Sequence, residues 1–168
     1  MNGSASKVSD WPPEPADYRQ DDYRSLVPKT LKGAKVITSN EAEQLIADRS
    51  VIFIDVYPRS PKPKNLPQGT LWRDTQHSTI EGAHWMPNVG YGVLSSDIET
   101  YFKTRLEKLT DHKKNCSLVF LCQRNCWMSW NAAKRAVSWG YTSVHWFPDG
   151  TDGWMMLGNS LQSVDPMP

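Results

Sequence analysis

The segment LVFLCQRNCWMSWNAAKRAVSWG, residues 118–140, decides the fold class of this chain. It opens with four apolar residues, which predict a strand buried on both faces of a sheet. After a polar loop that starts at Cys122, the pattern predicts a helix over residues 129–138 that ends at Gly140. A buried strand followed closely by a helix is typical of proteins in which helices cover a parallel sheet.

The same alternation of strands and helices extends outward from this segment. Apolar runs predict four further short strands, at residues 35–38, 51–56, 83–86 and 144–147. Two more helices are predicted, over residues 40–48 behind a capping-box pattern at Thr38 and Glu41, and after a second such pattern at Ser96 and Glu99. We therefore expect an α/β fold with a five-stranded, largely parallel sheet and helices on both faces.

The length of 168 residues fits one domain with extensions. We expect a Pro-rich N-terminal arm over residues 1–33, the folded domain over 34–157 and a C-terminal tail over 158–168. Within the domain, residues 57–80 form a Pro-rich insertion that exceeds the usual loop length, which indicates a lid or another functional segment.

Composition excludes several classes of protein. The chain has 19 basic and 18 acidic residues, a net charge of +1, which argues against nucleic acid as a partner. No apolar run approaches the roughly 18 residues that a membrane span needs. Three cysteines are too few for a disulfide scaffold or an all-cysteine zinc site.

The loop that starts at Cys122 is the candidate reactive site. Sites in open α/β sheets form outside the carboxyl ends of the strands, and a following helix adds backbone N–H groups and positive potential. A sulfur atom there is expected to be a thiolate, and Arg124 adds charge if it turns inward. The plain alternative is that Cys122 is a small buried hydrophobic residue, the role we assign to Cys116 at the other end of the strand.

Cys126 allows a second chemistry. Its spacing of four residues from Cys122 is compatible with a disulfide, and a close pair with one lowered pKa is the arrangement of thiol–disulfide exchange. Capture of a soft metal such as Cu(I), with His84 or His145 as a third ligand, ranks below this, and our prediction contains no metal site.

The rest of the loop is the predicted substrate-binding segment: Gln123, Arg124, Asn125, Trp127, Met128 and Ser129. Trp127 and its neighbour Trp130 either line a pocket, dock a partner or pack in the core. Lys134 and Arg135 are expected on a solvated helix face.

Three acidic residues are predicted to reach the same edge of the sheet. Asp55 ends a strand, and we expect its carboxylate to accept a hydrogen bond from a loop backbone. Asp149 and Asp152 follow the last strand; each precedes a glycine, and we favour a turn there over a chemical role.

The residues also carry a resemblance to a known family. In order along the chain these are Ile54-Asp55-Val56, Ile80-Glu81-Gly82-Ala83, the Cys122 loop, Asn131-Ala132-Ala133-Lys134-Arg135-Ala136 and the run from Gly150 to Trp154. Together they resemble a rhodanese domain over residues 34–156. More narrowly, the two cysteines with Trp127 and the segment WFPDGTDGW are similar to rhodanese-like proteins associated with pyrroloquinoline-quinone-dependent catabolism and named for a Cys–Cys–Trp motif. Residues 14–34 resemble the N-terminal segment of that group.

The resemblance implies a sulfurtransferase activity in which Cys122 carries sulfane sulfur as a persulfide. The donor would be thiosulfate or a persulfide, the acceptor a thiol, and no cofactor is implied. Because the group is usually exported, we expect a periplasmic mature form, with a cytoplasmic location as the alternative. The related cell-cycle phosphatases need an arginine six positions after the cysteine, where this chain has Met128, so phosphate-ester hydrolysis is disfavoured.

A different class of function is also compatible with these residues. The chain would then be a thiol–disulfide redox protein, or an assembly or interaction protein for a quinoprotein dehydrogenase or its cytochrome, and would use the Cys122–Cys126 pair.

Overall fold

A computed structural model describes residues 11–168, so the first ten residues of the predicted arm lie outside the described residues. The elements are β1 (Ala34–Val36), α1 (Ser39–Ile46), β2 (Ile52–Asp55), β3 (His77–Thr79), β4 (His84–Trp85), α2 (Ser96–Thr110), β5 (Ser117–Leu121), α3 (Trp127–Ser138), β6 (Ser143–Phe147), α4 (Gly150–Met156) and β7 (Gln162–Val164).

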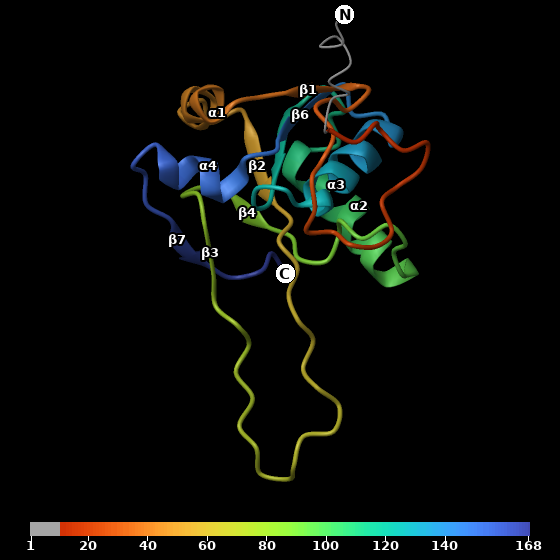
Figure 1. The fold of residues 1–168 in the computed structure, drawn as a ribbon, viewed down its shortest axis with the longest axis vertical. Coiled ribbons are helices and arrows are strands. Elements are labelled where there is room, and N and C mark those ends of the chain that lie inside the picture. Colours follow the sequence, from red (N-terminus) through yellow and green to blue (C-terminus); the bar gives the residue numbers. More distant parts are fainter. Residues whose placement is uncertain (1–10) are drawn as a thin grey trace, which may run out of the picture.

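Five strands form one parallel sheet in the order β1-β6-β5-β2-β4, whereas β3 and β7 pair antiparallel beside it (Figure 1). The central strand β5 is buried between β2 and β6, and its register places Asp55 opposite Leu121. The predicted five-stranded parallel sheet is confirmed, and its central strand is the one that leads into the cysteine loop.

Helices cover both faces of this sheet, as predicted. Alternate residues of a strand point to opposite faces, so Phe120 and Trp146 pack with α2 and α3. Val119 and Phe147 pack on the other face, with α1 and α4. Figure 1 shows the two pairs of helices on opposite sides of the sheet.

The structure corrects three predicted helix boundaries or turns. The N-cap of α2 is Ser95, whose hydroxyl accepts from the N–H of Ile98, and not Ser96. Helix α3 starts at Trp127, two residues earlier than predicted. The turns expected at Asp149 and Asp152 are instead the start of α4, whose two glycines gave no helical signal in the sequence.

The long connection and the C-terminal tail behave differently from each other. Residues 60–75 project away from the body of the molecule, and β3 occupies the end of the predicted insertion (Figure 1). The tail contains β7, and the N–H of Met167 donates to the carbonyl of Trp85 over 2.8 Å. None of the described helices has the length and apolar character needed to cross a bilayer.

Candidate functional site

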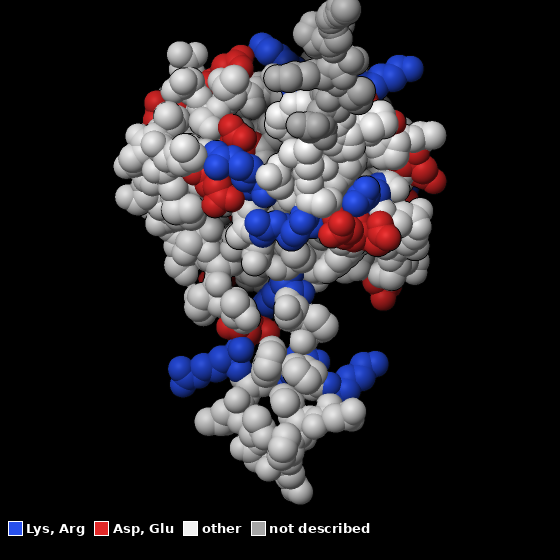
Figure 2. Space-filling view, viewed as in Figure 1, with Lys and Arg blue, Asp and Glu red and all other residues white. Residues whose placement is uncertain are grey.

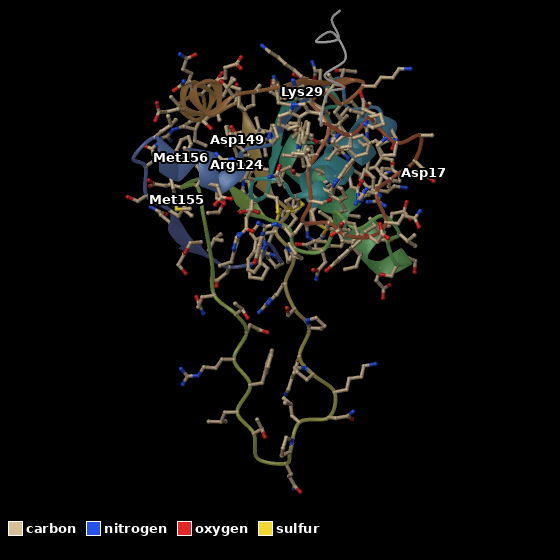
Figure 3. All side chains as sticks on the ribbon, in the orientation of Figure 1. Asp17, Lys29, Arg124, Asp149, Met155 and Met156 are labelled. Carbon is tan, nitrogen blue, oxygen red and sulfur yellow. The ribbon has the colours of Figure 1, made fainter. Side chains whose placement is uncertain are left out.

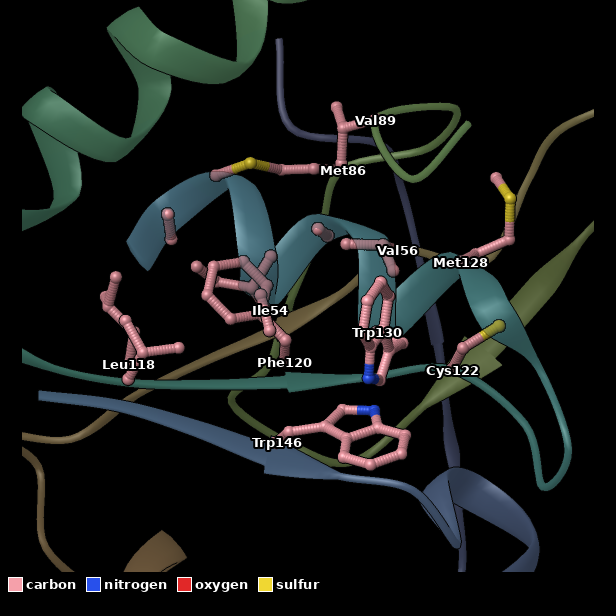
Figure 4. Close-up of a cluster of buried hydrophobic side chains, with 14 of the residues drawn as sticks. Ile54, Val56, Met86, Val89, Leu118, Phe120, Cys122, Met128, Trp130 and Trp146 are labelled. Atoms are coloured by element: carbon pink, nitrogen blue, oxygen red, sulfur yellow. The ribbon is translucent and has the colours of Figure 1, made fainter. Parts of the chain in front are cut away.

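The two loop cysteines are brought together at the carboxyl end of β5. Cys122 directly follows the strand, Asn125 turns the chain with a positive φ of 54°, and Cys126 is the N-cap residue of α3. The two Sγ atoms lie 2.7 Å apart, and both residues are buried, with 1% and 3% of their surface exposed. Figure 4 shows Cys122 beside Met128 and Trp130 in the buried cluster. The predicted pairing of Cys122 with Cys126 is therefore geometrically available.

The order of acidity in this pair corrects the expectation that Cys122 is the thiolate. Burial raises the pKa of Cys122 well above its usual value, and the Cys126 sulfur and the charge of Asp55 act in the same direction. The hydrogen bond from Cys122 lowers the pKa of Cys126, and the backbone N–H of Met128 and the charge of Arg24 also lower it. Of the two cysteines, Cys126 is therefore the more acidic, and its sulfur lies in direct contact with that of Cys122.

Asp55 lies at the end of the neighbouring strand and is fully buried. Its Oδ1 accepts from the backbone N–H of Tyr57 over 2.8 Å, which confirms the expected hydrogen bond to a loop backbone. Its Oδ2 lies 2.7 Å from Nε2 of His77, a residue that the sequence analysis did not single out. The His77 ring stacks on Tyr57 at 4.6 Å between ring centroids and lies 4.7 Å from Trp85.

His77 was missed because nothing local marks it. It is separated from Asp55 by the long connection, and its partnership depends on the pairing of β3 with β7. The structure therefore adds a contact between the buried Asp55 carboxylate and the partly buried His77 imidazole at the edge of the sheet that carries Cys122.

Arg124 turns away from the cysteines and towards α4. Its Nε lies 3.4 Å from Asp149, and its backbone N–H donates to Asp152 over 3.0 Å. In Figure 3 the labelled Arg124 and Asp149 lie together on this side of the molecule. The two carboxylates therefore orient the loop, and the Arg124 guanidinium contacts Asp149 and the Met156 sulfur instead of a cysteine sulfur.

Helix α4 closes the loop from the other side. The N–H of Thr151 donates to the carbonyl of Cys122 over 2.9 Å. Gly150 has a positive φ of 53°, and its Cα lies so close to the Cys122 carbonyl that a Cβ would collide with it. This close approach explains why a glycine-containing segment starts a helix there.

The N-terminal arm supplies further parts of the site. The N–H of Trp127, in the first turn of α3, donates to the carbonyl of Tyr23 over 2.8 Å. The Trp127 indole donates to Ser25 over 3.1 Å, and the Arg24 guanidinium donates to the Gln123 side chain. One of the helix amides that the sequence analysis assigned to a sulfur atom is thus bound to the arm.

The remaining predicted loop residues lie within α3 and are buried. Met128 packs in the core, and Ser129 accepts a hydrogen bond from the Trp146 indole over 3.0 Å. Trp130 is also buried and donates to the carbonyl of Thr30 over 3.1 Å. Of the three roles considered for Trp127 and Trp130, packing with the core and the arm is the one observed.

The expectation of a solvated face at Lys134 and Arg135 is wrong. The Lys134 ammonium donates to three successive carbonyls of the arm, those of Pro15, Ala16 and Asp17, at 3.0–3.3 Å. Arg135 is buried, and its guanidinium donates to the carbonyls of residues 89, 91 and 92. Both cations therefore donate hydrogen bonds to backbone carbonyls of distant segments, and the helical periodicity of the sequence cannot predict such contacts.

The other residues considered for chemistry lie apart from the pair or in separate contacts. Cys116 precedes β5 at the opposite end of the strand, and its Sγ lies 3.5 Å from the Thr110 carbonyl. Burial lowers the pKa of His84, and Nδ1 of His145 lies 3.1 Å from the Leu118 carbonyl. Within residues 11–168, no three His, Cys, Asp or Glu side chains are grouped to hold a metal ion.

Comparison with known proteins places this geometry in a known fold. No family model matches the chain, and neither does any curated protein. Among solved structures, the chain is similar to the 3-mercaptopyruvate sulfotransferase SseA from Escherichia coli, with a TM-score of 0.55 and 16% identity over 80% of this chain and 53% of that one. The structure of SseA is described as having the rhodanese fold.

The chain has a rhodanese fold. It is also similar to a complex of EanB with hercynine, with a TM-score of 0.53 and 15% identity over 78% of this chain and 32% of that one. The polysulfide-sulfur transferase homodimer from Wolinella succinogenes has a TM-score of 0.48 and 16% identity, over 79% of this chain and 80% of that one. The rhodanese-fold chain described here spans about half the length of SseA.

Proposed function

We propose that this chain transfers sulfane sulfur through a persulfide on Cys122, with Cys126 as its internal base. The observation that carries the proposal is the 2.7 Å separation of the two sulfur atoms at the carboxyl end of the central strand of a rhodanese fold. Sulfurtransferases of this fold, of which SseA is named as one, support the same chemistry for this chain.

The short separation of the two sulfur atoms supplies a path for proton transfer. In the proposed step, Cys126 in its thiolate form accepts the Cys122 proton across this contact while the Cys122 sulfur attacks the outer sulfur of thiosulfate. The donor S–S bond breaks, and sulfite leaves with the electron pair. Cyanide or an acceptor thiolate then takes the outer sulfur of the persulfide, and the proton returns from Cys126 to Cys122.

Access to the sulfur atoms requires movement of the segments that cover them. Both cysteines are buried, and the contacts of Tyr23 and Ser25 with Trp127 hold the arm over the start of α3. We therefore place a displacement of the arm or of the reactive loop before the attack on the donor.

Intact-mass measurement after incubation with thiosulfate tests this function. We expect the wild type to gain one sulfur atom and to release it as thiocyanate when cyanide is added. Cys122→Ser should abolish both results, Cys126→Ser should slow sulfur uptake, and the control Cys116→Ser should leave both unchanged. A wild type that takes up sulfur from neither thiosulfate nor a persulfide overturns the proposal.

Thiol–disulfide exchange is a second candidate, favoured by the same separation and by the lowered pKa of Cys126. The Cys126 thiolate would attack a partner disulfide and release one partner thiolate. Cys122 would then attack the Cys126 sulfur, so that the pair is oxidised and the second partner thiol is released. Unreduced protein that lacks two hydrogen atoms, mapped to this pair, supports exchange, whereas a gained sulfur on Cys122 supports transfer.

The cellular setting that we propose is the periplasm, in catabolism that depends on a quinoprotein dehydrogenase. Its support is the resemblance of the cysteine–tryptophan motif and of residues 14–34 to the pyrroloquinoline-quinone-associated group. Co-purification with a quinoprotein dehydrogenase or its cytochrome from an exporting host tests this setting. Binding that survives Cys122→Ala favours an assembly role over sulfur transfer, whereas recovery of the protein in the cytoplasm contradicts the setting.

A further inference from the structure

A cavity of about 340 Å³ lies between the N-terminal arm and the reactive loop. The arm contributes Trp11, Leu26 and Val27, and the loop contributes Arg124 and Asn125. This volume is at the lower end of the range for pockets that bind organic ligands, roughly 300–1,000 Å³. Thiosulfate is a compact inorganic anion and would fill only a small part of this cavity.

The cavity lining shares the buried cluster that contains the sulfur pair. Val27 lines the cavity and, with only 3% of its surface exposed, packs in the same buried cluster as Cys122 and Cys126. Asn125, which also lines the cavity, directly precedes Cys126 in the chain. A ligand in the cavity thus lies against the residues that would have to move to expose the sulfur atoms.

The cavity combines apolar walls with an excess of positive charge. Leu26 and Trp11 are partly exposed apolar residues, and Pro148 continues this wall beyond the reactive loop. Lys29 is exposed, its ammonium lies 5.1 Å from the centroid of the Trp11 ring, and no carboxylate in the described part of the chain pairs with it.

The other cation at the cavity is already partnered, because Arg124 contacts Asp149. Lys29, Arg124 and Asp149 lie on one side of the molecule in Figure 3. Figure 2 shows basic and acidic side chains interspersed over this face instead of gathered in one charged patch. Among the described residues that line the cavity, Lys29 is therefore the cation without a carboxylate partner, and its charge would select an anionic group.

We infer that this cavity binds an organic persulfide that has an apolar body and an anionic group, and presents it to the cysteine pair. The inference rests on the proposed sulfur transfer. The Cys122 sulfur attacks the terminal sulfur of the persulfide, the donor S–S bond breaks, and the organic thiolate leaves with the electron pair. The Cys122 proton passes to Cys126. Because one S–S bond forms as another breaks, the sulfane sulfur is transferred without net oxidation.

A comparison of three sulfur donors separates the contribution of the donor's apolar body from that of its anionic group. The donors are thiosulfate, the persulfide of N-acetylcysteine, and the persulfide of its uncharged methyl ester. We expect the wild type to prefer the anionic organic donor in kcat/KM. Lys29→Gln should lower kcat/KM for that donor by about fivefold, the effect of one exposed charge contact, and change the values for the other two donors by less than about twofold.

Two further variants complete the test. Leu26→Trp fills the cavity and should lower kcat/KM for both organic donors while that for thiosulfate is retained. Lys113→Gln, on the exposed turn after α2, is the matched control and should change none of the three values. If both cavity variants treat all three donors as the wild type does, the cavity inference is overturned and sulfur transfer still stands.

A binding measurement keeps the two hypotheses distinguishable. N-acetylcysteine, the thiol product, is titrated into Cys122→Ala while the NMR signals of the Trp11 indole and the Val27 methyl groups are followed. NMR shifts that become smaller in Lys29→Gln support the cavity as a ligand site, whether or not any donor is turned over. Binding without turnover of any donor would contradict the proposed sulfur transfer but not the cavity as a ligand site. Absence of shifts up to millimolar thiol overturns the cavity inference.

Discussion

The arm over residues 11–33 and the connection over residues 57–76 are similar in sequence and opposite in structure. Both are rich in proline, and within the described residues neither contains a helix or a strand. The arm buries Val27 and Leu31 in the core, whereas the connection projects from the body and leaves 88% of Leu71 exposed (Figure 1).

The difference lies in the hydrogen-bond donors that the body presents. A Pro-rich segment has few N–H groups and offers mainly carbonyls. Helix α3 supplies donors for these carbonyls from Trp130, Asn131 and Lys134. The connection receives fewer donors: the Trp85 indole donates to the carbonyl of Tyr57, its first residue. Further along, the indole of Trp72 and the guanidinium of Arg59 both pair with Asp74 within the connection. Order in a proline-rich segment is thus determined by its partner surface.

Removal of the arm gives the largest expected effect, and replacement of the connection is its control. Deletion of residues 1–33 should cost several kcal/mol, because two buried apolar side chains are lost at about 1.5–3 kcal/mol each and the cysteine pair is uncovered. Replacement of residues 60–73 by Gly-Ser-Gly should change stability by less than about 1 kcal/mol. Thermal unfolding followed by tryptophan near-UV circular dichroism, with the rate of thiol modification, measures both. An unchanged melting temperature after arm deletion contradicts the comparison.

The same contrast explains how much the sequence could predict. The apolar runs 51–56, 118–121 and 144–147 predicted the sheet, since a strand buried on both faces needs only local composition. The closeness of Cys122 and Cys126 was also expected from their spacing. These features depend on neighbours in the sequence.

The remaining parts of the site depend on residues that are distant in the sequence. Arg24 reaches Gln123 from the arm, and His77 reaches Asp55 across the long connection. The order of acidity in the cysteine pair follows from the burial of Cys122 and the contact between the two sulfur atoms, with smaller contributions from the charges of Asp55 and Arg24. No periodicity or local motif encodes such contacts, and helix α4 was missed for the related reason that its tertiary packing overrides weak helix propensity.

Asn131 gives the second-largest effect. It is fully buried, donates to the carbonyls of Arg19 and Gly90 at 2.8 Å, and accepts from the N–H of Arg19 at 3.0 Å. Asn131→Ala leaves the buried Gly90 carbonyl without this donor and should cost about 2–4 kcal/mol. Urea unfolding measures the loss, with Asn65→Ala in the exposed connection as the control at less than about 0.5 kcal/mol. Equal effects of the two substitutions would show that α3 does not hold the arm.

Lys134 gives a smaller effect, because its ammonium is only partly buried. Lys134→Met keeps the aliphatic length but removes the donors to three carbonyls and the cation over the Trp130 ring, 5.0 Å from its centroid. We expect a loss of about 1–2 kcal/mol and faster modification of the cysteine pair as the arm loosens. Lys64→Met in the connection is the matched control. A loss of stability without a change in thiol reactivity would show that the arm does not protect the cysteine pair from modification.

Leu71 gives the smallest effect and the sharpest check on the connection. A leucine with most of its surface in solvent contributes little apolar burial, so Leu71→Ser should change the free energy of unfolding by less than about 0.5 kcal/mol. The rate of thiol modification should also stay at the wild-type value, because Leu71 lies in solvent and outside the cluster that contains the cysteine pair. Urea unfolding and thiol titration on the same preparation measure both quantities. A loss of 1 kcal/mol or more would mean that Leu71 is buried in the folded protein, and the connection would then resemble the arm in solution.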